Sequence, residues 1–183
     1  MSREDGDEAL MLRYRNGDVR AFELLYERHK GPLFRYFLRQ CPQRAVAEEL
    51  FQEVWTSVVR SRERYRVRAK FTTLLYRMAH NRLIDYRRSA ASNPGHDGAA
   101  DVYEDRPDGS AAADERLDAD RRAAALRRAI ASLPPEQREA FLLREEGGLR
   151  LEQIAQVTGV GSETAKSRLR YAVMKLREAL SKA

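Results

Sequence analysis

The sequence lacks most of the residue patterns that carry enzyme chemistry. Its 183 residues include one cysteine, Cys41, which excludes an intramolecular disulfide and a four-cysteine zinc site. The three histidines, His29, His80 and His96, are scattered and form no metal-ligand spacing. No glycine-rich phosphate loop and no G-x-S-x-G motif is present. We therefore expect a protein that is not an enzyme, with no catalytic residue, cofactor or metal ion.

Long apolar runs are also absent. No stretch approaches the roughly 18 residues that a membrane span needs. The first ten residues, MSREDGDEAL, are acidic and polar, without the apolar core of a signal peptide. We expect a soluble protein of a reducing, cytoplasmic compartment. Hydrophobic residues still make up 43% of the chain, which is enough for a packed core and excludes a wholly disordered chain.

Charge is abundant and unevenly distributed. The formal net charge is +6 for the whole chain, but it is +7 for residues 1–90, −7 for 91–120 and +6 for 121–183. Two basic regions indicate a polyanion that is contacted at two places, although ordinary solvated helical domains can have similar charges. The acidic strip is rich in Ala, Asp, Gly, Ser and Pro, so we predict a flexible linker.

Residues 1–90 show helical periodicity throughout. The first helix is predicted from near Asp7 to the break at Gly17, and Asp18 is expected to cap the second. A further helix is predicted to open at Pro32. The clearest helix follows, because its apolar residues recur at the three- and four-residue spacing of one face. Those residues are Ala47, Leu50, Phe51, Val54, Trp55 and Val58. The opposite face is acidic, and a solvated surface is its ordinary interpretation.

A basic segment, residues 61–70, precedes another predicted helix, residues 71–89. Its predicted buried face consists of Phe71, Leu74, Leu75, Met78 and Ile84. Its predicted solvent-exposed face carries cations that can bind phosphates, together with groups that can stack on bases or form hydrogen bonds with them. A plain polar surface would look the same.

Residues 121–183 carry a predicted helix-turn-helix. Asp120 is expected to cap a first helix, and Pro135 suits the first turn of a second. A short third helix ends at Gly159, where a tight turn between helices needs glycine, and Ser162 is expected to cap the last helix. That last helix has small or polar residues at its start and cations further along, as a major-groove reading helix requires. The alternative is a helical hairpin with a solvated basic face.

Taken together, these segments resemble the extracytoplasmic-function (ECF, group 4) sigma factors of the sigma-70 family. The resemblance to sigma region 2 lies in the segments GDVRAFELLYERH, AEELFQEVW and FTTLLYRMAHNRLIDYRR. The resemblance to sigma region 4 lies in the segment LPPEQREAFLLREEGGLRLEQIAQVTGVGSETAKSRLRYAVMKLREAL. The resemblance implies an all-α fold of two small helical domains, region 2 in residues 1–90 and region 4 in 121–183, joined by the flexible acidic linker 91–120.

The resemblance also implies the function. A bacterial alternative sigma factor binds core RNA polymerase, directs it to specific promoters and helps to melt the minus-ten element. It serves a stress or envelope regulon under the control of an anti-sigma factor. One helix docks on a coiled coil of the largest polymerase subunit, and region 4 also binds the polymerase flap. The residues that match the docking motif are Glu49, Leu50, Gln52, Glu53 and Val54.

Promoter contacts are implied in both modules. A basic loop captures a flipped base of the minus-ten element, at a cost of a few kcal/mol that a pocket lined by aromatic and polar groups offsets in part. The minus-ten set is Arg62, Arg64, Tyr65, Arg66, Arg68, Lys70, Arg77, His80, Asn81, Arg87 and Arg88. The minus-thirty-five set is Ser162, Glu163, Thr164, Lys166, Ser167, Arg168 and Arg170.

This sequence departs from the usual family residues at Leu74, His80, Arg82 and Ala165, so the resemblance implies no promoter sequence. A stand-alone repressor or activator is the alternative. It would use the same helix-turn-helix, usually as a dimer, with the first module as a ligand or dimerisation domain.

Overall fold

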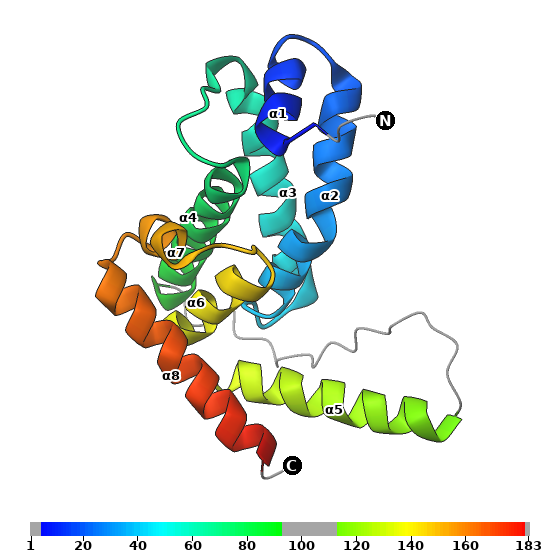
Figure 1. Cartoon of the computed structure of the whole chain (residues 1–183), viewed down its shortest axis with the longest axis vertical. Helices are drawn as coiled ribbons and strands as arrows, with labels where there is room; N and C mark the ends of the chain where they lie inside the picture. Colours follow the sequence, from blue (N-terminus) through cyan, green and yellow to red (C-terminus); the bar gives the residue numbers. More distant parts are fainter. Residues whose placement is uncertain (1–4, 93–112, 182–183) are drawn as a thin grey trace.

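The computed structural model describes residues 5–92 and 113–181, and this part of the chain is helical, without strands (Figure 1). The N-terminal module contains α1 (Asp7–Arg15), α2 (Val19–Leu38), α3 (Arg44–Ser61), the 3-10 turn η1 (Arg62–Arg64) and α4 (Phe71–Ser92). The C-terminal module contains α5 (Ala113–Ala131), α6 (Pro135–Glu145), α7 (Leu151–Thr158) and α8 (Ser162–Ser181). The predicted all-α class with two helical domains is confirmed.

The N-terminal module packs around aromatic side chains from α1, α2 and α3. The ring of Trp55 lies 5.0 Å from that of Tyr26 and 5.8 Å from that of Phe22, between ring centroids. Phe22 in turn lies 4.8 Å from Tyr14. These pairs bury one face of α3 in the core, as its periodicity predicted. The acidic face of α3 is therefore fixed on the outside of the module.

Helix α2 corrects one expectation. Pro32 lies inside α2 rather than at the start of a separate helix. A proline in a helix removes one backbone hydrogen bond and strains the preceding turn. Here the loss is offset because α2 buries one continuous apolar face, which includes Leu25, Leu33 and Phe37 on both sides of the proline. The predicted cap at Asp18 is confirmed, since its carboxylate accepts a hydrogen bond from the Ala21 amide at 3.3 Å.

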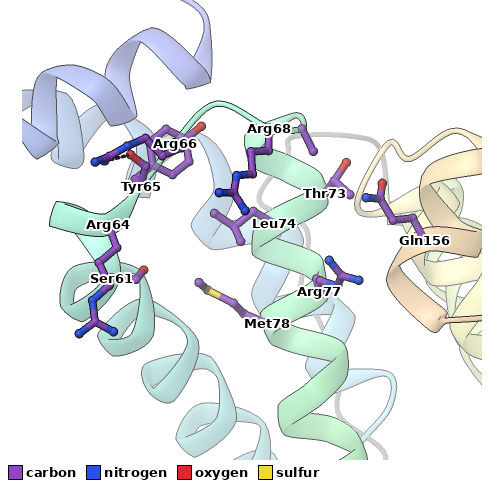
Figure 2. A pocket seen from close by; sticks show the side chains of 11 residues that line it. Ser61, Arg64, Tyr65, Arg66, Arg68, Thr73, Leu74, Arg77, Met78 and Gln156 are labelled. Atoms are coloured by element: carbon purple, nitrogen blue, oxygen red, sulfur yellow. Dashed lines mark hydrogen bonds between the residues drawn. The ribbon is translucent and has the colours of Figure 1, made fainter.

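Helix α4 also corrects the predicted buried face. Leu74, Met78 and Ile84 are only partly buried, and the core side of the helix includes Thr73, Tyr76 and Leu83 instead. Sequence periodicity missed this rotation because Thr73 and Tyr76 face a second partner, the C-terminal module. Leu74 and Met78 are left on the side of α4 that faces the end of α3 (Figure 2).

The C-terminal module contains the expected helix-turn-helix. Gly159, after α7, has a φ of +68°, a left-handed conformation that L side chains rarely adopt. Ser162 is the first residue of α8 rather than its cap, and the Gly161 carbonyl accepts the first backbone bond, from Ala165. Ala165, Ala172 and Leu176 bury one face of α8, which leaves its polar stripe outside.

Helix α5 begins earlier than expected. It starts at Ala113, so Asp120 lies inside it and does not cap it, and the last part of the predicted linker is helical. The sequence there is rich in alanine, with acidic residues before basic ones, an order that favours a helix through propensity and the helix dipole. The flexible-linker prediction for residues 93–112 lies outside the described residues. The C-terminal end of α5 lies against α8, and α7 lies against α4 (Figure 1).

Candidate functional site

The expected docking face on α3 is divided by the structure into exposed and buried residues. Glu49 and Gln52 are exposed and Glu53 is half-buried, whereas Leu50 and Val54 are 6% and 0% exposed. The two aliphatic residues therefore hold α3 in the core, and only the polar members of the expected set reach the surface. Glu53 lies 3.5 Å from Arg82 of α4, so part of this face is already braced by an ion pair.

A cavity of about 450 Å³ lies between the segment after α3 and the first half of α4 (Figure 2). This size is in the range of pockets that hold small organic ligands. The residues that line the cavity are Ser61, Arg64, Tyr65, Arg66, Arg68, Ala69, Thr73, Leu74, Arg77, Met78 and Gln156. Five of them belong to the expected minus-ten set, so the structure brings this part of the set together.

The wall of the cavity is polar on one side and apolar on another. Leu74 and Met78 point from α4 toward the end of α3, while Arg77 lies on the side of α4 nearer to Gln156 of α7 (Figure 2). Arg64 and Arg77 are exposed, and neither makes an ion pair within the described residues. Such a site suits a flat apolar group attached to an anion, which is the chemistry of a nucleotide.

The segment beside the cavity is fixed by hydrogen bonds to its backbone. The carbonyl of Tyr65 accepts bonds from Arg15 at 3.2 Å and from Arg66 at 2.9 Å. At the start of α4, the amide of Phe71 donates to the carboxylate of Glu8 in α1 at 2.7 Å. The bonds from Arg15 and to Glu8 hold both ends of residues 65–71 against α1. The loop is thus positioned by the fold before any ligand is present.

Tyr65 itself is less accessible than a base-stacking role requires. Its side chain is 6% exposed, and its buried hydroxyl makes no hydrogen bond within the described residues. Burial raises the pKa of this hydroxyl, with a further contribution from Glu8 and Asp7. Tyr65 therefore lines the wall of the cavity as a neutral group, and the exposed surface there belongs to the arginines.

The other members of the minus-ten set lie outside the cavity. Lys70, Asn81 and Arg88 are exposed. Arg62 stacks on Tyr14, with its guanidinium 5.6 Å from the ring centroid. His80 and Arg87 are half-buried and face Glu139 of α6, at 2.6 Å and 3.8 Å.

Several cavity residues were missed as site residues by sequence reasoning. Ser61, Ala69, Thr73 and Gln156 carry no distinctive pattern, and Gln156 comes from the other module. Leu74 and Met78 had been assigned to the core. Their helical spacing on α4 was visible, but nothing in the sequence showed that this face lies beside a cavity.

The expected minus-thirty-five residues form one exposed strip on α8. Ser162, Glu163, Thr164, Lys166 and Arg170 are exposed, and Ser167 and Arg168 are half-buried. Lys166 and Glu163 are 3.8 Å apart on a solvated surface, where such a pair contributes little. The lysine is thus free to bind an anion. The first turn of α8 carries small polar groups, which lets a helix approach base edges closely.

Cys41 is expected to be unreactive. Burial raises the pKa of its thiol to about 12, although Arg87 opposes the shift. A shift of that size lowers the thiolate fraction at neutral pH by roughly 1,000-fold, and the thiolate is the reactive form. Alkylation by iodoacetamide should therefore be at least about 100-fold slower in the native chain than in urea. Equal rates in the two conditions would contradict this assignment.

The described helices include none that is long and apolar enough to cross a membrane. Residues 5–92 and 113–181 also contain no group of three His, Cys, Asp or Glu side chains arranged to hold a metal ion.

Comparison with known proteins gives consistent results over both modules. The family model "Sigma-70 region 2" matches residues 25–93, and "Sigma-70, region 4" matches residues 123–176. RNA polymerase sigma factor CarQ of Myxococcus xanthus is 34% identical over 174 residues, which cover 93% of this chain and 95% of CarQ. The ECF RNA polymerase sigma-E factor of Escherichia coli K12 is 28% identical over 187 residues, 98% of this chain and 95% of that protein.

Two solved structures share the fold. CnrH, in complex with the cytosolic domain of CnrY, has a TM-score of 0.68 at 20% identity and covers 97% of this chain and 99% of its own. The sigma factor RpoE, in complex with the anti-sigma factor NepR from Bartonella quintana, has a TM-score of 0.70 at 19% identity, over 87% and 96% of the two chains. The two family models and the relatives aligned along the chain agree: the chain belongs to the sigma-70 family, as an ECF sigma factor that acts in transcription initiation.

Proposed function

We propose that this sigma factor binds core RNA polymerase through the exposed residues of α3 and reads two promoter elements with two separate surfaces. The cavity beside α4 binds the minus-ten element, and α8 binds the minus-thirty-five element. The observation that carries the proposal is the cavity, because it gathers Arg64, Arg66, Arg68 and Arg77 around an apolar floor of Leu74 and Met78. Cations for phosphate and an apolar surface for a base are the two requirements of single-strand binding.

The lining of the cavity can stabilise the minus-ten element in its melted form. A base that leaves the duplex loses its stacking, at a cost of a few kcal/mol. Contact with Leu74 and Met78 returns part of that energy, and the arginines attract the displaced phosphates. Since the loop is already held in place by Glu8 and Arg15, little ordering entropy is lost on binding.

Helix α8 supplies the second promoter contact. Ser162, Thr164 and Lys166 lie at the start of the helix, where a recognition helix meets base edges in the major groove. Arg168 and Arg170 lie one turn further on and reach the neighbouring phosphates. The short α7 and the left-handed turn at Gly159 set the angle at which α8 enters the groove.

Further partners follow from the family. We infer that the C-terminal module also contacts the polymerase flap and that an anti-sigma factor regulates this chain, as the complex of RpoE with NepR suggests. Tyr171, Met174 and Leu180 of α8 are exposed apolar residues suited to such a protein contact. The chain itself performs no catalysis, and it acts in the cytoplasm, where the polymerase is.

Reconstitution tests the proposal directly. The purified chain is mixed with bacterial core RNA polymerase, separated by size exclusion, and assayed for transcription on a library of genomic fragments. We expect co-elution and new start sites that share two sequence elements. Failure to co-elute, with DNA binding by a dimer of the chain alone, would instead support the repressor interpretation.

Replacing Gln52 and Glu53 together by Ala should weaken core binding by about 10-fold or more. Each exposed polar contact in an interface contributes about 1 kcal/mol, and two such losses multiply. Fluorescence anisotropy of labelled chain titrated with core polymerase measures the effect. Glu23→Ala on α2 is the matched control, since Glu23 is exposed and lies outside this face. Undiminished binding of the double variant would count against α3 as the docking surface.

A further inference from the structure

The loop that joins η1 to α4 has no buried side chain of its own. Residues 66–70 are all exposed, and among them Arg66 and Arg68 line the cavity (Figure 2). A loop whose side chains lie in water is positioned by its backbone and by its two ends. Those ends are Tyr65 and Phe71, whose side chains are 6% and 0% exposed. The positions of the loop cations at the cavity therefore depend on how the two ends are held.

The end of the loop is held by a side chain from a distant helix. Lys70, the residue before α4, has no acceptor atom and places a cation at the positive end of the helix dipole. A capping residue would normally accept a hydrogen bond there. Glu8 of α1 supplies the acceptor instead, because its carboxylate accepts a bond from the Phe71 amide at 2.7 Å. Glu8 is half-buried and lies 63 residues earlier in the chain, so α1 fixes the point at which the loop ends.

The start of the loop is held by the other end of α1. Arg15 donates to the Tyr65 carbonyl at 3.2 Å. Just before the loop, the guanidinium of Arg62 in η1 lies over the ring of Tyr14, 5.6 Å from its centroid. Glu8 and Arg15 are about two turns apart on the same helix. Because the helix between them keeps a constant length, α1 sets the spacing between the two ends of the loop.

Helix α1 is itself attached to α2 near both of its ends. At its start, Asp7 lies 2.7 Å from Nε2 of His29 and 3.0 Å from Arg28. The hydrogen bond with His29, assisted by the charge of Arg28, lowers the pKa of Asp7, so this carboxyl group is ionised at neutral pH. Near its end, Arg13 donates to Asp18 at 2.9 and 2.7 Å. The position of the loop is therefore set by α1, and the position of α1 is set by α2.

We propose that Glu8 and Arg15 of α1 are positioning residues for the minus-ten loop, and that they determine its discrimination between bases without touching DNA. The inference rests on the proposed function for what the loop reads, but the attachment of the loop to α1 is independent of it. A mobile surface adapts to several partners, whereas fixed polar groups reject the wrong partner. Attraction between the loop cations and phosphates depends little on such fixing. Release of the loop should therefore reduce base discrimination more than affinity.

Amide hydrogen exchange in the free chain, followed by NMR, tests the attachment itself. In Glu8→Ala the Phe71 amide loses its acceptor, and its exchange should become about 10-fold faster or more. Glu8→Gln keeps an acceptor oxygen and should retain the slow exchange of the parent. Glu23→Ala on α2 is the matched control, because Glu23 is exposed and lies outside this contact. Equal exchange in the parent and in Glu8→Ala would overturn the attachment, whatever the promoter assays show.

Competition between promoters for the reconstituted holoenzyme tests the effect on reading. Templates that carry each base in turn along the minus-ten element are compared. Glu8→Ala should lower discrimination about fivefold or more, as expected for the loss of one fixed hydrogen bond, and Glu8→Gln should restore it. Arg15→Ala releases the other end of the loop and should act in the same direction, with the exposed Arg20→Ala on α2 as its control. Binding of a single-stranded oligo(dT) should differ by less than about twofold between Glu8→Ala and Glu8→Gln, which remove the same charge.

A double variant of the cavity, Arg64→Ala with Arg77→Ala, separates failure of this inference from failure of the proposed function. If the double variant loses discrimination while Glu8→Ala and Arg15→Ala keep it, the role of α1 in reading is overturned and the cavity remains the site. If all of these variants keep the discrimination of the parent, both the cavity and the role of α1 are overturned. Equal losses of oligo(dT) affinity and of discrimination in Glu8→Ala would reduce Glu8 to a residue that stabilises the fold, which also overturns the inference.

Discussion

Replacing Arg64 and Arg77 together by Ala should reduce the rate of open-complex formation by about 100-fold or more. Both side chains line the cavity, are exposed and make no ion pair within the described residues, so they are available to the displaced strand. A hydrogen bond to a charged group contributes about 1.5–3 kcal/mol, and two lost contacts multiply to at least that factor. Chemical reactivity of unpaired thymines at the minus-ten element measures opening.

Two controls separate this effect from general loss of charge. Arg20→Ala on α2 removes an exposed cation that lies outside the cavity, and it should change the rate by less than about twofold. Binding of the double variant to core polymerase should equal that of the parent, because α3 is untouched. Full opening activity in the double variant would show that the minus-ten element is melted elsewhere on the chain.

Helix α3 shows that sequence periodicity predicts a helix and its buried side well. Apolar residues at helical spacing fixed both the helix and its buried side, and the core confirms them at Ala47, Val54 and Val58. The same pattern worked for α8, where the buried face and the polar stripe are on opposite sides. Each of these two helices is buried by the other helices of its own module. One apolar face in the sequence was therefore enough to predict its buried side.

Helix α4 shows where this reasoning fails. Its residues face two partners, the N-terminal core and the C-terminal module, and its apolar pattern does not separate them. Thr73 is buried because Gln153 bonds to it from a helix about 80 residues later in the chain. No local sequence pattern can predict a partner so far away in the chain. The sequence could therefore identify Arg77 and His80 as candidate site residues, but it could not show that Arg77 is exposed and His80 half-buried.

Two acids at the contact between the modules show a related limit. Nothing in the sequence around Glu139 and Glu146 predicts that these carboxylates are buried. Their burial depends on cations that belong to α2 and α4. The role of a charged residue at a contact between domains is therefore decided by tertiary structure, while its helix is decided locally.

Lys166→Ala should weaken recognition of one base pair of the minus-thirty-five element by about 1–3 kcal/mol, a factor of roughly 5 to 150. Lys166 is exposed on the second turn of α8, and its only described ion pair, with Glu163, is solvated and weak. Arg170→Ala should instead weaken binding to all sequences and lower the salt dependence of binding by about one unit of slope. Arg170 lies a turn beyond Lys166 and stacks on Tyr171, so we expect it to contact the DNA backbone rather than the bases.

Competition of variant promoters for the reconstituted holoenzyme, repeated at several salt concentrations, distinguishes the two effects. Lys175→Ala, an exposed lysine further along α8, is the matched control and should leave both the base preference and the salt slope unchanged. A loss of base preference in Arg170→Ala, with none in Lys166→Ala, would mean that α8 enters the groove with its second half. An unchanged preference in both variants would remove α8 as the reading helix.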